Sequence, residues 1–326
     1  MKHPAIALTA LSFALASSAA FADEYAALLK AKKYAEVERA ASARLGAEPN
    51  NAEALVAKTK AIVAQRQESR MDEAAKLAEQ CIAAHPQKSE CHGALGDALG
   101  NKAMMGGIMS AIGYAGKIRE AYLKAVELDP NNIAARSSLQ LYYLMAPGIV
   151  GGSKSKAQAL AADTAKVNVQ AGKLLQARIE LDDEKLAQAE NLTLSANPAG
   201  SDALQQLHLD VLSSVGNTYL HEKKYADAER VFQEVAKRHP ESGIGAFGLA
   251  RTLQEKGKPA DAIPLYEKAL AIEPRAAIYY RLGQCWQIAS DKAKAMAAFE
   301  KALSFKPALP KQLKAEAEEQ LKALKG

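Results

Sequence analysis

A repeat of about 34 residues is the sequence feature that most constrains the fold. Seven prolines, with asparagine or small residues nearby, follow one another at separations of 37, 44, 68, 42, 34 and 33 residues, and 68 is twice 34. This length fits two short antiparallel helices with their turns, and proline suits the point where the second helix must end. The prolines are Pro49, Pro86, Pro130, Pro198, Pro240, Pro274 and Pro307. The spacing therefore predicts a stack of helix pairs instead of a few globular domains.

The composition favours the same fold class. Alanine makes up about a fifth of the 326 residues, whereas aromatic residues make up 6%. Alanine is the strongest helix former and is too small to fill the space between two sheets, so the composition predicts an all-α protein with close helix contacts. The formal net charge of +5 is too small and too dispersed to predict nucleic-acid binding.

Three consecutive units, 212–240, 246–274 and 279–307, share one pattern of large, small and aromatic residues. In the third unit, Leu282-Gly283 is followed by Trp286, Ala295, Phe299, Ala302 and Pro307. The pattern resembles the tetratricopeptide repeat. The resemblance implies a right-handed α-solenoid of antiparallel helix pairs, in which small residues let helices approach and an aromatic residue fills the space beside them. We expect about eight units beyond residue 22.

The match to this pattern varies along the chain and divides it into blocks. Residues 23–199 form a divergent N-terminal block with insertions near 101–116 and 146–154, and residues 200–308 form a regular block. Residues 309–326 are rich in lysine, glutamate and glutamine, with leucines on one stripe. They are predicted to form a capping helix that covers the last apolar face.

The first 22 residues have the pattern of a secretory signal peptide. A short polar start containing Lys2 precedes an apolar, alanine-rich stretch at about 5–16, and Ala20-Phe21-Ala22 fits the small-x-small cleavage pattern. The stretch is too short for a membrane anchor, which needs about 20 apolar residues, and no later segment has a membrane-spanning pattern. We therefore expect cleavage after Ala22, a bacterial periplasmic location and no transmembrane segment in the mature chain.

The three cysteines raise two questions of chemistry. Cys81 falls late in one predicted helix and Cys91 early in the next, so in an oxidising compartment they could form a disulfide, the alternative being two buried thiols. Cys285 has no partner nearby in the sequence. His85 and His92 complete a Cys-x3-His-x5-Cys-His pattern, but Cys91 and His92 would point about 100° apart on a helix, which disfavours zinc. We expect no metal, no cofactor and, because no catalytic motif is present, no enzymatic activity.

In tetratricopeptide proteins the first helix of each pair lines the surface that binds an extended peptide or a partner's helix. The corresponding positions here are Asn217, Leu220, His221, Ile244, Phe247, Arg251, Gln254, Tyr280, Gln284 and Gln287, of which all except Leu220 are predicted to bind a partner. Phe247 and Tyr280 are not required for packing in the family's pattern, so large rings there predict a contact surface. Arg251 could pair with an acidic group of the partner. The alternative is an ordinary solvated surface.

Chaperone-binding members of the family hold a terminal carboxylate with a Lys/Asn/Asn/Lys/Arg set. Asn217 and Arg281 match this set, whereas Ser213, Gly248 and Ala277 replace its other members. The sequence therefore does not predict that carboxylate clamp.

The two insertions suggest a second kind of site. The first is rich in glycine and methionine, and we favour the interpretation that it packs as the core of an elongated helix pair over that of an adaptable apolar surface. The second contains proline and three glycines and predicts a loop, with weak similarity to periplasmic repeat proteins associated with TRAP-type transporters. An apolar pocket between them would be lined by Met104, Met105, Met109, Leu141, Leu144 and Met145.

Two functions are consistent with these patterns. The leading one is a non-enzymatic periplasmic scaffold that binds a protein or peptide partner of the cell envelope. The alternative is a carrier or transport accessory that binds a small apolar ligand in the pocket near residues 100–152.

Overall fold

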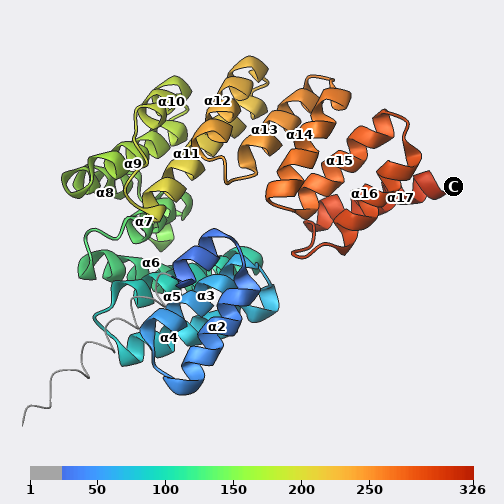
Figure 1. Cartoon of the computed structure of the whole chain (residues 1–326). Helices are drawn as coiled ribbons and strands as arrows, with labels where there is room; N and C mark the ends of the chain where they lie inside the picture. The colour runs from blue at the N-terminus through green and yellow to red at the C-terminus, as the bar shows by residue number, and fades with distance from the viewer. Residues whose placement is uncertain (1–23) are drawn as a thin grey trace, which may run out of the picture. The chain divides into compact units, whose positions relative to one another are not determined.

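The computed structural model describes residues 24–326, in which every regular element is a helix (Figure 1). The helices pack in consecutive pairs, which confirms the all-α solenoid prediction. None of the described helices is both long and apolar enough to cross a bilayer. The predicted signal peptide, with its cleavage after Ala22, lies outside the described residues. The described residues separate into two compact units, the first ending at Ser153 and the second being Lys154–Gly326.

The first unit consists of short helices, each packed on the next along the chain. After a helical segment at 24–30, its elements are α2 (Tyr34–Ala47), α3 (Ala52–Ala64), the 3-10 helix η1 (Glu68–Arg70), α4 (Met71–Ala84), α5 (Ser89–Met105), α6 (Gly107–Leu128), α7 (Ile133–Met145) and the 3-10 helix η2 (Gly148–Val150). Asn51 and Asn132 begin α3 and α7, because their side-chain oxygens accept hydrogen bonds from amides three residues later at 3.0 and 2.9 Å.

The second unit continues the same arrangement. Its helices are α8 (Lys154–Val167), α9 (Val169–Asp182), α10 (Leu186–Leu194), α11 (Asp202–His221), α12 (Tyr225–Arg238), α13 (Ile244–Glu255), α14 (Pro259–Ile272), α15 (Ala276–Ile288), α16 (Lys292–Ser304) and α17 (Lys311–Lys325). Helix α17 packs on α16 and buries Ala317 together with one side of its leucine stripe. It therefore lies over the last apolar face of this unit.

The division into compact units differs from the division by repeat regularity. The units divide after Ser153, whereas the repeat pattern becomes regular near residue 200. Helices α10 and α11 lie on either side of residue 200 and pack together, and α11 also contacts α9. The blocks defined by the sequence therefore describe how closely each repeat follows the pattern, not where the packing is interrupted.

The second insertion forms the loop that the sequence predicts. Helix α7 ends at Met145, and the chain turns through η2 with Gly151 at φ +100°. A side chain at Gly152 would overlap the carbonyl of Ala146, so only glycine fits this turn. The Tyr142 hydroxyl donates a hydrogen bond to the Val150 carbonyl and ties the loop to α7.

Aromatic rings fill the spaces that small residues leave between helices. Phe232 on α12 is 1% exposed, and a Cβ atom at either Gly216 on α11 or Gly248 on α13 would collide with its ring. Phe299 and Gly283 repeat this contact between α15 and α16. Each ring therefore depends on glycines of neighbouring helices, as the repeat pattern implies.

A disulfide joins consecutive helices of the first unit. The sulfur atoms of Cys81, in the last turn of α4, and Cys91, in the first turn of α5, are bonded, with Cα atoms 5.5 Å apart. His85 instead contacts the Asn50 carbonyl at 2.6 Å, and His92 contacts the Pro86 carbonyl at 2.9 Å. With both thiols bonded to each other, these four residues do not offer a zinc ligand set.

Loss of this disulfide is expected to lower the free energy of unfolding of the first unit by about 2–3 kcal/mol, because a short cross-linked loop restricts the unfolded chain. Urea denaturation followed by circular dichroism, with and without dithiothreitol, measures the difference. The double variant Cys81→Ala/Cys91→Ala should show no response to the reductant, and Cys285→Ala should respond as the wild type does. Equal stability of the oxidised and reduced wild type would contradict the prediction.

Candidate functional site

Polar side chains on four helices of the second unit form a hydrogen-bonded row, which we call the polar ladder. Its members are Asn217 on α11, Arg251 and Gln254 on α13, Tyr280, Arg281, Gln284 and Gln287 on α15, and Glu316 and Gln320 on α17. Helices α11, α13 and α15 are the first helices of their pairs, so their equivalent faces line up along the unit. The ladder brings together six of the nine residues predicted to bind a partner.

Hydrogen bonds connect polar-ladder residues of neighbouring helices. Nη1 of Arg251 donates to Oδ1 of Asn217 at 2.8 Å and links α13 to α11. Nε2 of Gln254 donates to Oε1 of Gln284 at 3.2 Å and links α13 to α15. These long polar side chains are thus held in a defined arrangement along the face.

Tyr280 is not the exposed ring that the sequence predicts. It is 5% exposed, and its ring lies 6.0 Å from that of Phe299. Its hydroxyl donates to Oε2 of Glu316 on α17 at 2.7 Å and accepts from Nε2 of Gln284 at 2.9 Å. Burial and the carboxylate of Glu316 raise the pKa of Tyr280 to about 12. The expectation fails because α17 covers the ring, so Tyr280 orients the ladder instead of offering a free aromatic surface.

Helix α17 contributes residues that the sequence analysis treated only as a solvating cap. Nε2 of Gln287 donates to Oε1 of Gln320 at 2.8 Å. Gln312 donates to Oε1 of Glu316 at 3.0 Å, and hydrogen bonds from Tyr280 and Gln312 lower the pKa of Glu316. The spacing of four residues between 312, 316 and 320 places them on one helix face, which is the signal that could have identified them.

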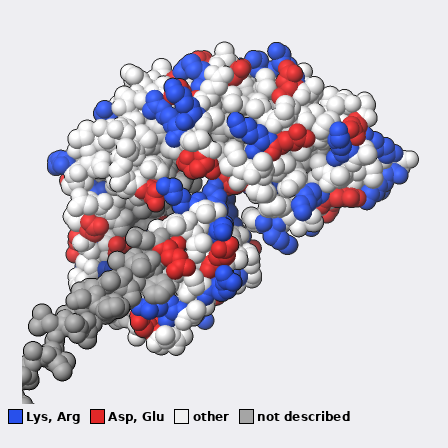
Figure 2. All heavy atoms as spheres, viewed as in Figure 1, with Lys and Arg blue, Asp and Glu red and all other residues white. Residues whose placement is uncertain are grey.

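Charge is dispersed over the face seen in Figure 2, where basic and acidic side chains are interspersed, but the ladder contains a local excess of cations. The guanidiniums of Arg251 and Arg281 lie 4.0 and 3.8 Å from the same carboxylate oxygen of Glu255. Burial and the nearby Arg281 lower the pKa of Arg251, and its buried Nε has no hydrogen-bond partner. The two arginines thus share the carboxylate of Glu255, a residue that no sequence pattern indicated.

The other three predicted partner-binding residues differ in position. Phe247 is half-buried, with its ring 6.0 Å from that of Tyr266 and 5.7 Å from the Arg251 guanidinium, so it supports that guanidinium as well as the core. Ile244 is half-buried against the core around Phe232, and His221 is exposed at the end of α11.

The structure also explains why the carboxylate clamp is missing. A side chain at Gly248 would overlap the Phe232 ring, so this position belongs to the helix contact. Ser213 is buried, and its hydroxyl has no hydrogen-bond partner. Asn217, which matches the clamp, is bonded to Arg251.

The predicted apolar pocket is not an enclosed site. The first insertion does form an elongated pair, α5 and α6, but Met104 and Met109 are 73% and 81% exposed, so they are not its core. Met145 is 64% exposed and Leu141 43% exposed, whereas Met105 and Leu144 are half-buried. The insertion extends beyond its neighbours, and its apolar side chains consequently face outward.

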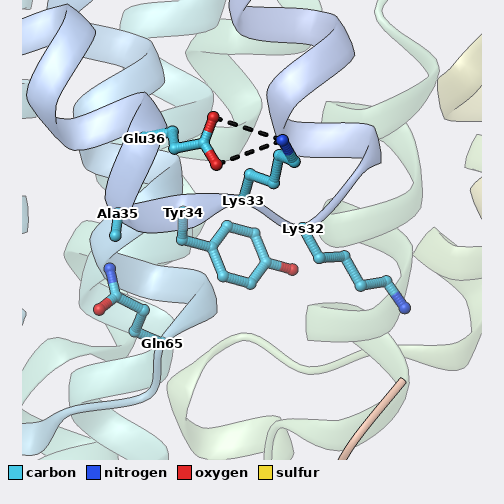
Figure 3. Close-up of a pocket in the computed structure, with 6 residues that line it drawn as sticks. All are labelled: Lys32, Lys33, Tyr34, Ala35, Glu36 and Gln65. Carbon is cyan, nitrogen blue, oxygen red and sulfur yellow. Dashed lines mark hydrogen bonds and ion pairs between the residues drawn. The ribbon is translucent and has the colours of Figure 1, made fainter. Parts of the chain in front are cut away.

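A small depression lies elsewhere in the first unit, at the start of α2 (Figure 3). Its lining residues are Lys32, Lys33, Tyr34, Ala35, Glu36 and Gln65. Lys33 and Glu36 form an ion pair across it at 3.2 Å. Its volume of about 260 Å³ is below the range of roughly 300–1,000 Å³ that is typical of small-molecule sites.

In residues 24–326, no group of three or more histidine, cysteine, aspartate or glutamate side chains is placed to hold a metal ion. Two histidines do meet in the second unit, where Nδ1 of His208 lies 2.8 Å from Nε2 of His239 and both rings are buried. Glu241 lies 3.6 Å from the other ring nitrogen of His239, Nδ1, and both rings lie in the core beside α11 and α12.

Comparisons with known proteins agree with the helical-repeat fold. The family model for the tetratricopeptide repeat matches residues 216–272 and 247–310. A solved structure of yeast Tom70 is similar over 90% of this chain and 59% of its own, with 14% identity and a TM-score of 0.64. Human IFIT1, solved as a dimer with PPP-AAAA, is similar over 84% of this chain and 62% of its own, with 16% identity and a TM-score of 0.51.

A tetratricopeptide repeat protein from Parabacteroides merdae covers 93% of this chain and 97% of its own, with 18% identity and a TM-score of 0.44. The chain spans less than two thirds of Tom70 and of IFIT1, and at these identities the likeness concerns the fold alone. No curated protein matches the chain. The prediction of tetratricopeptide repeats is confirmed for residues 216–310, the part of the chain in which the family model places its repeats.

Proposed function

We propose that this protein is a non-enzymatic scaffold of the bacterial periplasm that binds an acidic segment of a cell-envelope protein on its polar ladder. The tetratricopeptide fold is that of a protein–protein interaction scaffold. The periplasmic location rests on the signal-peptide pattern of residues 1–22. Recovery of the protein in the periplasmic fraction, with the mass of residues 23–326, tests that part of the proposal.

The observation that carries the proposed binding is the imbalance of charge around Glu255. Two guanidiniums share this one carboxylate at 3.8–4.0 Å, and the Nε of Arg251 is buried without a partner. A carboxylate from a partner would compensate the second cation by contacting the exposed part of the two guanidiniums. The arginines are already positioned by the hydrogen bonds that they donate to the side-chain oxygens of Asn217 and Gln254, which reduces the entropy lost on binding.

The alternative of a small-ligand carrier is less well supported. It requires an enclosed apolar pocket near residues 100–152, and the side chains predicted to line it face outward, with Met109 81% exposed. A carrier must withdraw most of its ligand's surface from water, which an outward-facing surface of this kind does not do.

The double variant Arg251→Gln/Arg281→Gln is expected to bind the partner at least about tenfold more weakly. Removing the charges that face an acidic group of the partner weakens binding by more than about tenfold. Crosslinking in the periplasm identifies the partner, and titration of the purified pair measures its affinity. Arg275→Gln is the matched control, since Arg275 also pairs with a glutamate but lies outside the polar ladder. Unchanged affinity in the double variant, or an equal loss in the control, would refute the proposed surface.

A further inference from the structure

The end of the α5–α6 pair, residues 103–116, is a second exposed surface, which we call the hairpin tip. Four large apolar side chains face outward there: Met104 (73% exposed), Ile108 (79%), Met109 (81%) and Ile112 (50%). Isolated exposed apolar residues are ordinary on protein surfaces. Four of them within nine residues form a concentrated apolar patch, and such patches typically mark binding surfaces.

The tip extends past the helices on both sides. Helix α6 has 22 residues and α7 has 13, so at about 1.5 Å per residue α6 is longer by roughly 13 Å. Lys102 forms an ion pair with Asp72, in the first turn of α4, so the chain beyond Lys102 has passed the start of that helix. On the other side, the Arg119 side chain lies against Gly151, beyond the end of α7. The large apolar side chains at the end of the pair therefore have no neighbouring helix over them, whereas Ala103 and Ala115 nearer its base are buried.

Cations slightly outnumber anions around the tip. Residues 103–116 contain no charged residue, and Lys102, Lys117 and Arg119 flank them, against Asp72 beside Lys102 and the exposed Glu120. Lys102 is neutralised by Asp72, whereas Lys117 is exposed at the base of the tip. The hairpin tip is therefore a projecting apolar end with an exposed cation, Lys117, at its base.

We propose that the hairpin tip inserts into the interface of an anionic lipid membrane. A projecting end can enter the fluid boundary between headgroups and acyl chains without a matching cavity, while basic residues behind it meet the anionic headgroups. Flexible methionine side chains suit such a disordered environment. A protein partner would instead need a concave surface that fits this end. Entry of the tip into the membrane is shallow and reversible, and it does not depend on binding at the polar ladder.

Flotation with lipid vesicles tests the proposal. The full-length gene is expressed, the form recovered is identified by intact mass, and all variants are treated alike. Vesicles of phosphatidylcholine alone are compared with vesicles that also contain phosphatidylglycerol. We expect the wild type to bind the anionic vesicles at least about tenfold more strongly than Ile108→Ser/Met109→Ser does. Ile288→Ser, which removes an apolar side chain 64% exposed on α15, is the control and should bind as the wild type does.

A fluorescent label reports the position of the tip directly. A cysteine introduced by Ser110→Cys and labelled with an environment-sensitive dye should shift its emission to shorter wavelength on anionic vesicles, whereas the same dye at Ala289→Cys should not. Absence of flotation, equal flotation of the double variant, or no spectral shift at position 110 would overturn the proposal. So would a wild-type dimer that the double variant does not form, because the tip would then bind a second copy of the chain.

Discussion

Replacement of Phe232 by alanine is expected to lower the free energy of unfolding of the second unit by about 3–5 kcal/mol. The ring is 1% exposed and lies between glycines of two neighbouring helices, so no side chain is available to fill the space it leaves. The contact also joins successive helix pairs, and in a repeat protein stability depends on such nearest-neighbour contacts. Urea denaturation followed by circular dichroism measures the loss.

Two further variants make the test specific. Phe232→Leu should lose distinctly less stability than Phe232→Ala, because it retains most of the buried apolar volume. Ile288→Ala should change the free energy of unfolding by no more than about 0.5 kcal/mol, since its side chain is 64% exposed. A loss below about 1 kcal/mol for Phe232→Ala would show that the ring does not join the neighbouring helices as described.

The buried histidine pair is expected to make the second unit sensitive to acid. Nε2 of His208 lies 3.2 Å from the Thr193 carbonyl, so this nitrogen carries the proton and Nδ1 accepts from Nε2 of His239. A second proton on His208 would place two donors face to face. Burial, the neighbouring His239 and Arg238 lower the pKa of His208 to about 4, and burial lowers the pKa of His239, although Glu241 opposes this.

The direction of the pH effect follows from the difference between folded and unfolded states. An unfolded histidine takes up a proton near pH 6.5, whereas folded His208 does so only near pH 4. As the pH falls through this interval, the unfolded state alone binds the proton, so stability is lost. Below about pH 4 both states are protonated and the loss from this group stops growing, at about 3 kcal/mol in total.

Chemical denaturation at a series of pH values measures this loss. The variant His208→Asn should show a smaller decrease in stability between neutral pH and about pH 4 than the wild type shows. His221→Asn, on the same helix but with an exposed side chain, is the control for the other groups that titrate in this range. Parallel pH profiles for all three proteins would contradict the assignment to His208.

Much of the fold could be predicted from the sequence because its determinants are local and repeated. The proline spacing and the glycine–aromatic pairs specify helix pairs and their contacts, as Phe299 and Gly283 illustrate. The loop at 146–153 was predictable for the same reason, since its glycine positions exclude other residues. Six of the nine residues predicted to bind a partner fall in the polar ladder because equivalent positions of successive repeats lie on one face.

Exposure was less predictable, because it depends on what packs over each repeat. Tyr280 occupies a surface position of the pattern but is covered by α17, which follows the last repeat. Met109 is apolar, as core residues are, but it is 81% exposed because neither α4 nor α7 extends over the end of the α5–α6 pair. In both cases the exposure depends on whether a segment outside the repeat unit lies over the side chain.

The sequence by itself determined the helix pairs, their close contacts and the expectation of a leader, since each depends on residues near one another in the chain or at a fixed period. Only the tertiary structure decided which side chains are uncovered, that Arg251 and Arg281 share the carboxylate of Glu255, and that His208 meets His239. These features join residues of different helices at separations that no local pattern specifies. The surfaces proposed for binding, the polar ladder and the hairpin tip, belong to this second group for the same reason.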